Sequence, residues 1–272
     1  MQKYIGIFLR EKIPNIHSLL HTFKCELSEY GYSLLIDEGN CYGLEGVSLE
    51  RIERESEFIL SLGGDGTLIS TLRKIHSLPI LGINAGRLGF LTGIGVSDFL
   101  SFIPKLASGD YKVQEHTMLG VYLNKSLLSL CINEVLISKN TLSTMTQIEA
   151  KINQKAFNRY YCDGLIIATP TGSTAYNISA GGSVVYPYCK NILLTPLAPH
   201  SLTQRPMVVG DNMELEFEVF EESKIIIDGQ KMLDFLPTQT LKVRRNPQSA
   251  QLIYPKERDY FEVLREKFHW GE

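Results

Sequence analysis

The segment SLGGDGTLIS, residues 61–70, places three glycines around the carboxylate of Asp65. It joins the apolar run EFILSLG, residues 57–63, to TLISTLRKI, residues 67–75, and these patterns predict a buried strand followed by a helix. Backbone N–H groups at the start of a helix lack partners and attract anions, and glycines let a phosphate chain approach the backbone closely. We therefore expect Gly63, Gly64 and Thr67 to bind phosphate.

The position of Asp65 inside such a turn has two interpretations. A carboxylate would repel a phosphate, but a phosphoryl-transfer site needs a group that accepts the proton of the attacking hydroxyl or holds Mg²⁺. Alternatively, Asp65 is only the N-cap of the helix. The segment is neither a P-loop, since no G-K-[ST] follows, nor the G-x-G-x-x-G dinucleotide fingerprint.

The surrounding residues alternate strand and helix signals. KYIGIFLR (3–10), YSLLID (32–37) and LPILGIN (78–84) are predicted strands, and Ile16, Leu20 and Phe23 mark one face of a helix. SDFLSFIPKLASG (97–109) is a predicted helix with Ser97 as its N-cap and Gly109 at its end. Uniformly apolar strands are usually covered on both faces, which predicts a Rossmann-like parallel sheet in an α/β domain over residues 1–109.

From about residue 111 onward the apolar period changes to two. KSLLSLCINEVLIS, QIEAKINQKAFNRYY, MELEFEV and TLKVRR are predicted strands, and in MELEFEV the glutamates alternate with Leu215, Phe217 and Val219. This pattern predicts an all-β domain over residues 110–254, with antiparallel sheets that have one solvated face. Residues 255–272 return to a helical period, and we expect this helix to dock on the α/β domain through Tyr260, Phe261, Leu264 and Phe268.

A second turn lies in CDGLIIATPTGSTAYNISAGG, residues 162–182. An apolar strand over residues 165–168 is followed by Thr-Pro-Thr-Gly and then by a short helix, which we expect to be capped by Ser173 or Thr174 and to end at the Gly-Gly pair. Hydroxyls, including that of Thr171, and the ring of Tyr176 could bind a ribose and stack on a base. The alternative interpretation is a well-capped connection between strands.

Composition limits the remaining possibilities. With 27 basic and 30 acidic side chains and no long run of either sign, the formal net charge is -3, so nucleic acid is not an expected partner. No signal segment and no apolar run near the roughly 18 residues of a membrane span is present, which predicts a soluble cytoplasmic protein without a membrane partner. The cysteines are few and widely spaced and contain no C-x-x-C, so we expect reduced thiols.

These segments together resemble the NAD kinase family. The matching motifs are GGDGT (63–67), LGINAGRLGFL (81–91), NE (133–134), DGLIIATPTGSTAYNISAGG (163–182), LAPHSLTQRPMVV (197–209), DGQ (228–230) and YFEVLREKFHWG (260–271). GGDG is shared with phosphofructokinases and with diacylglycerol and sphingosine kinases, whereas TPTGSTAY is far more specific.

The resemblance implies an N-terminal α/β domain, a C-terminal β-sandwich, a C-terminal segment that returns to the first domain, and a homodimer or homotetramer. It also implies a reaction in which Asp65 accepts the proton of the 2′-hydroxyl of the adenosine ribose of NAD. That oxygen attacks the γ-phosphate of ATP, which is bound with Mg²⁺ or another divalent cation, and NADP is formed. Whether polyphosphate replaces ATP is left open.

Residue roles follow by position in the family's motifs. Asp65 and Gly66 would contact NAD, Asn133 and Glu134 would hold its adenosine half, Asp163 would reach the nicotinamide side, Ala198 would pack near the nicotinamide and Gln230 would close the far side. The adenine and sugar would be lined by Thr174, Ala175, Tyr176, Asn177, Ile178 and Ser179. Thr144 falls at another contact position of the family. Tyr161 and Cys162 stand where many relatives carry a basic and a small residue, which affects the expected contact with the pyrophosphate.

Several of these residues have structural alternatives. Asn133 and Glu134 would suit the solvated side of a strand, and Asp228 would suit the turn that follows IIID. Two other functions also stay open: a dinucleotide sensor without catalysis, and a lipid or sugar kinase that shares GGDG.

Overall fold

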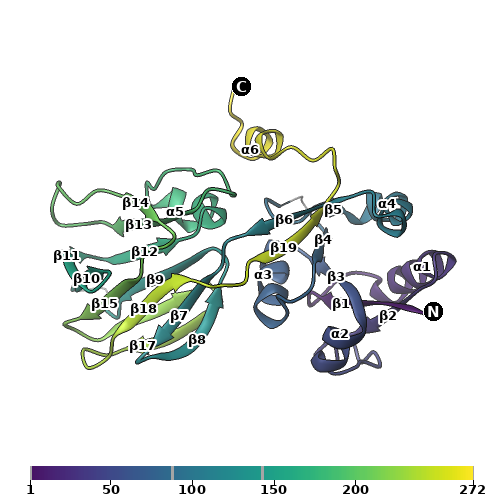
Figure 1. Cartoon of the computed structure of the whole chain (residues 1–272), viewed down its shortest axis with the longest axis horizontal. Coiled ribbons are helices and arrows are strands. Elements are labelled where there is room, and N and C mark those ends of the chain that lie inside the picture. Colours follow the sequence, from purple (N-terminus) through teal and green to yellow (C-terminus); the bar gives the residue numbers. More distant parts are fainter. Residues whose placement is uncertain (1, 87–88, 142–143, 272) are drawn as a thin grey trace. The chain divides into compact units, whose positions relative to one another are not determined.

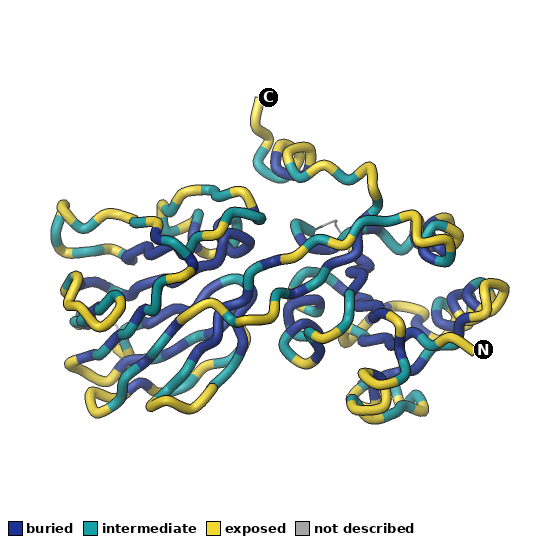
Figure 2. The backbone as a smooth tube through the Cα atoms, in the orientation of Figure 1, coloured by how far each residue is buried: buried dark blue, intermediate teal, exposed yellow. Residues whose placement is uncertain are grey.

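A computed structural model of the chain describes residues 2–86, 89–141 and 144–271. It divides into two compact units, one made of residues 1–115 and 251–272 and the other of residues 116–250. Figure 2 shows that in each unit the strands are largely buried and the connecting loops largely exposed. We describe each unit by itself.

The first unit is built on a sheet with the strand order β2-β1-β3-β4-β19-β6, in which β5 pairs with β4 (Figure 1). Pairing is parallel between β1 and β2, β1 and β3, β3 and β4, β4 and β5, and β4 and β19. Its strands are β1 (Lys3–Leu9), β2 (Tyr32–Ile36), β3 (Ser56–Gly63), β4 (Ile80–Asn84), β5 (Ile94–Gly95), β6 (Lys112–His116) and β19 (Ala250–Tyr254). The predicted parallel sheet is confirmed.

Helices cover both faces of this sheet. They are α1 (Ile16–Glu29), α2 (Leu49–Glu55), α3 (Asp65–Lys74) and α4 (Val96–Ser108), and a further helix, α6 (Tyr260–Phe268), follows β19 near the end of the chain. On one face, α1 and α4 pack with Ile5 and Ile7, and the rings of Phe23 and Phe99 lie 4.5 Å apart between their centroids. Successive residues of a strand face opposite sides of the sheet, so Gly6 lies on the face opposite to Ile5 and Ile7. On that face Ile52 of α2 packs against Gly6.

Two details of these helices differ from the sequence prediction. Ser97 is not the N-cap of α4, because β5 leads directly into the helix and Gly95 is the residue that precedes its first turn. Gly109 ends α4 in the left-handed region at φ 74°, as expected. Helix α2 was not predicted, since only Ile52 is buried in its charged sequence; Ser48 caps it by accepting a hydrogen bond from the N–H of Arg51.

The second unit contains two antiparallel sheets, with the strand orders β11-β10-β15-β18-β7-β8 and β14-β13-β12-β9-β16-β17. The first sheet comprises β7 (Leu119–Leu123), β8 (Ser126–Cys131), β10 (Thr146–Ile152), β11 (Lys155–Cys162), β15 (Leu215–Val219) and β18 (Leu241–Arg245). The second comprises β9 (Glu134–Lys139), β12 (Gly164–Ala168), β13 (Asn191–Leu197), β14 (Met207–Gly210), β16 (Ser223–Ile227) and β17 (Lys231–Phe235). One apolar core takes side chains from both sheets, so the predicted antiparallel β domain is confirmed. The ends of its predicted range 110–254 form β6 and β19, which belong to the sheet of the first unit.

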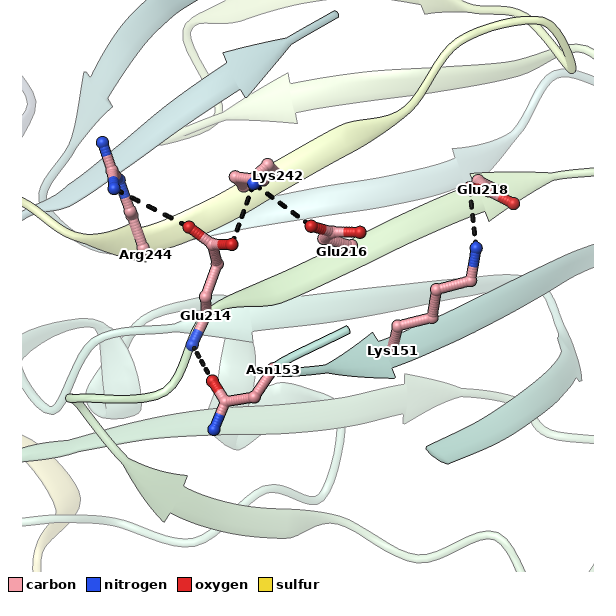
Figure 3. Close-up of polar contacts among 7 residues, drawn as sticks. All are labelled: Lys151, Asn153, Glu214, Glu216, Glu218, Lys242 and Arg244. Atoms are coloured by element: carbon pink, nitrogen blue, oxygen red, sulfur yellow. Dashed lines mark hydrogen bonds and ion pairs between the residues drawn. The ribbon is translucent and has the colours of Figure 1, made fainter. Parts of the chain in front are cut away.

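The solvated face of β15 carries the glutamates that alternate with its buried residues (Figure 3). Glu214 and Glu216 both pair with Lys242, at 2.8 and 3.1 Å, and Glu218 pairs with Lys151 at 2.9 Å. Opposite charges alternate across neighbouring strands, which stabilises this register and keeps the face polar.

The C-terminal helix α6 is shorter than its predicted segment, and one of the four residues predicted on its packed side is exposed. Asp259 caps it by accepting from the N–H of Phe261, and its buried residues are Val263 and Leu264. Phe261 is exposed, so its predicted place on the packed side is wrong. Within the ranges that the structure describes, no helix is long and apolar enough to span a membrane.

Candidate active site

Asp65 is the first residue of α3, directly after the turn that ends β3. Gly64 occupies the N-cap position and makes no side-chain cap, so the interpretation of Asp65 as the N-cap is wrong. The hydroxyls of Ser61 and Thr71 lie 3.1 Å apart in a buried hydrogen bond that joins β3 to α3. The carboxylate is therefore carried by a strand and a helix that are fixed to each other.

The carboxylate of Asp65 is held by a loop distant in sequence. It accepts hydrogen bonds from the backbone N–H groups of Phe90 (2.7 Å), Leu91 (3.3 Å) and Thr92 (3.0 Å). A side chain at Gly89 would leave no room for this arrangement, because its Cβ would lie 2.0 Å from Oδ1 of Asp65. The sequence offered Asp65 no partner because its partners are backbone groups.

The loop that holds Asp65 is itself fixed by Thr92. The Thr92 hydroxyl accepts from Nδ2 of Asn84 and from the N–H of Gly89, both at 3.0 Å. Asn84 ends β4, so the loop is anchored to the end of a central strand. These residues lie in or beside the LGINAGRLGFL motif, of which residues 87 and 88 lie outside the described ranges.

The residues predicted to bind phosphate surround the same turn. Gly63 ends β3 and its carbonyl accepts from the N–H of Ala85 at 2.8 Å. Gly66 is exposed in the first turn of α3, and the N–H of Thr67 is bonded to the carbonyl of Gly64 at 3.0 Å. Gly64 has open space where a side chain would be, so a ligand can approach its backbone.

In the second unit, three segments distant in sequence meet at one end of a sheet. Strand β9 runs antiparallel to both β12 and β16, with Glu134 opposite Ala168 and Val135 opposite Ile227. The start of β9 therefore lies beside the ends of β12 and β16. This geometry brings Asn133 and Glu134 to the TPTGST turn and to the DGQ hairpin.

The TPTGST turn packs directly on the backbone that precedes β9. The Thr169 hydroxyl donates to the carbonyl of Ile132 at 2.6 Å and accepts from the N–H of Gly172 at 3.0 Å. Only glycine fits at position 172, since a Cβ there would lie 2.1 Å from the carbonyl oxygen of Asn133. Thr171 is buried and its hydroxyl lies 2.9 Å from Nδ1 of His116.

Asp228 and Glu134 are two buried carboxyl groups at this end of the sheet. Asp228 reaches beyond its own turn, because its carboxylate accepts from the N–H groups of Ile132 (3.1 Å) and Asn133 (2.7 Å). Burial, and then the charge of Asp228, raise the pKa of Glu134 to about 7, although the N–H of Tyr176 partly opposes this. Oε2 of Glu134 is buried and has no hydrogen-bond partner among the described residues.

The helix predicted after TPTG is a 3-10 turn, Thr171–Thr174, followed by the short α5, Tyr176–Ser179. Neither Ser173 nor Thr174 caps α5, which begins after Ala175; the Ser173 hydroxyl instead bonds both the N–H and the carbonyl of Val185 at 3.0 Å. The ring of Tyr176 is 46% exposed, and Ile178 and Ser179 follow it on the same short helix.

Asn177 differs from its neighbours because its side chain is fully engaged. Its Nδ2 donates to the carbonyls of Ser173 and Ser183, and its Oδ1 accepts from the hydroxyl of Thr195 at 2.6 Å. The amide thus joins α5 to β13. The residue is fully buried and its carbonyl accepts from the N–H groups of Ala180 and Gly182, so Asn177 holds the turn in place.

Other predicted residues gather at the opposite end of β12. The N–H of Asp163 bonds the carbonyl of Leu197, next to Ala198, and Lys139 pairs with the Asp163 carboxylate at 2.7 Å. Tyr161 is exposed and its ring lies edge-on to His200 at 5.7 Å, while Cys162 is buried, which raises the pKa of its thiol to about 12.

The last three predicted residues are less enclosed. Ala198 is exposed with φ 42°, a conformation that is costly for a residue other than glycine. Gln230 is exposed and follows Asp228 and Gly229 in the β16–β17 hairpin. Thr144 is exposed and its hydroxyl lies 2.8 Å from that of Thr141. It precedes Thr146, which pairs with Cys162, so it lies toward the Asp163 end of β12.

Comparison with known proteins agrees with this geometry. A family model described as the ATP-NAD kinase N-terminal domain matches residues 4–111, and one described as the ATP-NAD kinase C-terminal domain matches residues 132–254. An NAD kinase of Helicobacter hepaticus is 47% identical over 98% of this chain and 96% of its own length. The chain belongs to the NAD kinase family. Its function is that of an NAD kinase, so the sequence prediction of a kinase is confirmed.

Further NAD kinases show the same relationship along the whole chain. That of Wolinella succinogenes is 41% identical over 98% of this chain and 96% of its own length. Among solved structures, an Archaeoglobus fulgidus NAD kinase in complex with ATP has a TM-score of 0.81 and 26% identity, each chain being 98% covered. Yeast NADH kinase complexed with NADH shares the fold, with a TM-score of 0.90 and 22% identity over 100% of this chain and 89% of its own.

Proposed function

We propose that Asp65 accepts the proton of the 2′-hydroxyl of the adenosine ribose of NAD while that oxygen attacks the γ-phosphate of ATP. The new bond joins the ribose oxygen to the γ-phosphorus, the bond to the β-phosphate oxygen breaks, and NADP and ADP are the products. The observation that carries this proposal is the three backbone N–H groups that hold the Asp65 carboxylate.

This arrangement suits a positioned base. A carboxylate offers about four lone-pair positions, and the loop at Phe90, Leu91 and Thr92 uses three of them. One acceptor position is left for a substrate hydroxyl. Because the other three are bonded to a fixed loop, the direction of this fourth position is determined before the substrate arrives, which is the condition for efficient proton transfer.

We propose that Mg²⁺ arrives bound to the phosphates of ATP. Mg²⁺ keeps several waters and is usually held by substrate phosphates with one or two carboxylates. Over residues 2–86, 89–141 and 144–271, no group of three or more His, Cys, Asp or Glu side chains gathers into a metal site. The described residues therefore fit a Mg²⁺ ion that is bound by the triphosphate of ATP. The positive charge of that ion would offset the negative charge of the phosphates near Asp65. Gly63, Gly64 and Thr67 would bind the phosphate groups at the start of α3, and Gly66 would contact NAD.

The adenosine half of NAD is proposed to lie at the end of β12, where Glu134 has a buried oxygen without a partner. A ribose hydroxyl donated to that oxygen would satisfy it. Asn133 would add a second polar contact. The residues that would line the sugar and base are Thr171, Thr174, Ala175, Tyr176, Asn177, Ile178 and Ser179, with Gln230 at the hairpin.

The nicotinamide side is proposed to lie at the start of β12, beside Asp163 and Ala198. Strand β12 has five residues. At about 3.3 Å per residue, the residues proposed to bind adenosine at its end and those proposed to bind nicotinamide at its start are roughly 15 Å apart. An extended dinucleotide can reach both. Tyr161 offers an aromatic ring there in place of a cation, and Thr144, two residues before the Thr146–Cys162 pair, would lie at the same side.

The decisive test compares Asp65→Asn with the unsubstituted protein in NADP formation from NAD, ATP and Mg²⁺. The rate should fall by at least about 100-fold, as is typical when a general base is lost, while NAD binding measured by calorimetry stays unchanged. Asp98→Asn is the matched control, because Asp98 lies in the first turn of α4 as Asp65 does in that of α3. Equal losses of turnover and binding in Asp65→Asn would reject the role of base.

The same assay addresses the alternatives. NAD binding by the unsubstituted protein without NADP formation would indicate a dinucleotide sensor, and phosphorylation of a lipid or sugar alcohol would indicate another GGDG kinase. Replacing ATP by polyphosphate shows whether it is a donor.

We also propose that the protein acts as a homodimer or homotetramer in the cytoplasm, as the family resemblance implies. Light scattering on the purified chain would measure its mass against the 30.7 kDa of one copy.

A further inference from the structure

The C-terminal segment of the chain contacts the loop that holds Asp65. Nη2 of Arg258 donates to the carbonyl oxygen of Phe90 at 2.6 Å. The ring of Phe268, in α6, lies 5.5 Å from the ring of Phe90, and Trp270 stacks on Phe268 at the same centroid distance. In Figure 1 this segment leaves β19 and ends in α6. The C-terminal segment thus holds Phe90 through the hydrogen bond from Arg258 and the aromatic contact with Phe268.

One peptide unit links Arg258 to Asp65. The carbonyl of Phe90 accepts from Arg258, and the N–H of the same peptide, which belongs to Leu91, donates to Oδ1 of Asp65 at 3.3 Å. A trans peptide is planar, with its carbonyl and N–H pointing in opposite directions. Fixing the direction of the carbonyl therefore fixes the direction of the N–H toward the carboxylate.

The guanidinium of Arg258 is well placed to act as this anchor. It lies over the ring of Tyr254 in β19, 4.2 Å from its centroid, and the backbone carbonyl of Arg258 accepts from Nζ of Lys112 at 2.6 Å. Both contacts come from the central sheet of the first unit. A hydrogen bond from a charged donor is also stronger than one between neutral groups.

We propose that Arg258 is a positioning residue for Asp65, acting through the Phe90–Leu91 peptide. The inference rests on the proposed role of Asp65 as the base. Without the guanidinium the peptide loses the contact that fixes its carbonyl, although the N–H groups of Phe90 and Thr92 still bond the carboxylate. The longer bond from the N–H of Leu91 is then weakened, and the remaining acceptor position points less accurately toward the substrate hydroxyl. A loss of alignment of this kind lowers the rate of the chemical step more than it lowers substrate binding.

The test is a double-mutant cycle between positions 258 and 65. Arg258→Met keeps the aliphatic part of the side chain but removes the guanidinium, and with it the donor to Phe90 and the group that lies over Tyr254. We expect kcat to fall by about 10- to 100-fold, within the range that a misplacement of about 1 Å produces, with KM for NAD changing less than about twofold. Arg258→Lys, which restores one charged donor, should recover part of kcat. In the Asp65→Asn background, Arg258→Met should lower the residual rate by less than about twofold, since residues that act as one unit are not additive.

Lys105→Met is the matched control. Lys105 pairs with Glu257, the neighbour of Arg258, at 2.7 Å, so this variant loosens the same turn without touching Phe90. Its kcat should remain within about twofold of the unsubstituted value, because exposed ion pairs contribute little. Circular dichroism and thermal unfolding of each variant separate a change in kcat from a loss of folded protein; if Arg258→Met does not fold, the cycle is run with Arg258→Lys.

The outcomes distinguish this inference from the proposed function. An equal loss of kcat on changing Arg258 in both backgrounds, or no loss in either, would overturn the positioning role and leave Asp65 as the base. Full activity of Asp65→Asn would overturn both.

Discussion

Replacing Glu134 with glutamine should stabilise the ligand-free protein above pH 7 and leave its stability nearly unchanged at pH 4.5 or below. Glu134 is only 7% exposed at the start of β9, and its Oε2 has no partner among the described residues. Burial and the charge of Asp228 raise the pKa of its carboxyl to about 7, from an ordinary value of 4.5. The folded protein therefore binds this proton more tightly than the unfolded chain does.

The sign and size of the effect follow from this difference. Since the folded state holds the proton more tightly, the free energy of unfolding falls as the pH rises from 4.5 to about 7. The pKa of Glu134 differs by about 2.5 between the unfolded and folded states. At roughly 1.4 kcal/mol for each pKa unit, this lowers the free energy of unfolding by about 3 kcal/mol above pH 7. Glutamine has nearly the same shape and carries no charge at any pH, so Glu134→Gln removes this cost.

The assay is urea unfolding of both proteins without nucleotide at pH 4.5 and pH 8. We expect the variant to exceed the unsubstituted protein by up to about 3 kcal/mol at pH 8 and by much less at pH 4.5. Glu222→Gln is the control, because Glu222 is exposed and its replacement should have the same small effect at both pH values. A stability difference for Glu134→Gln that does not vary with pH, or a variant that is less stable at pH 8, would refute the reasoning.

Three further substitutions test the two turns. Tyr176→Ala should weaken NAD binding by about 1 kcal/mol or more in calorimetry, with little effect on unfolding because the ring is 46% exposed; unchanged affinity would remove Tyr176 from the site. Gly172→Ala should destabilise the protein by about 1–3 kcal/mol in urea unfolding, since its Cβ would meet the carbonyl of Asn133 at 2.1 Å. Gly89→Ala should lower kcat at least about tenfold in steady-state kinetics, because the new Cβ would displace the Asp65 carboxylate, and full activity would show that this contact is not needed.

Much of the fold could be predicted from the sequence because the apolar period is clear in both units. The uniformly apolar β1, β3 and β4 indicate a sheet covered on both faces, and the alternation in β15 indicates one solvated face. Helix α2 has too few buried residues to leave such a pattern. The place of Phe261 in α6 was also misjudged, since a helix of nine residues with apolar side chains on more than one side does not specify which of them packs.

The candidate site was predictable where a side chain or a glycine marks it, as at Asp65 and in TPTGST. The bonds that fix these residues were not predictable, because they come from backbone groups brought together by the fold. Asp228 shows the difference: its sequence suggests a residue that serves its own turn, yet its carboxylate binds the N–H groups before β9. Such partners are set by the antiparallel register of β9 and β16.

The position of β19 has a consequence for the order in which the chain folds during synthesis. This strand lies between β4 and β6 in the sheet of the first unit, yet it is made only after the whole of residues 116–249. The second unit can therefore complete its sheets on the ribosome while β4 is paired only with β3 and the short β5. Until residues 250–254 emerge, the place of β19 beside β4 exposes the unpaired backbone of a strand edge, which is a site of aggregation. Nascent chains halted before β19 should depend on chaperones more than those halted just after it.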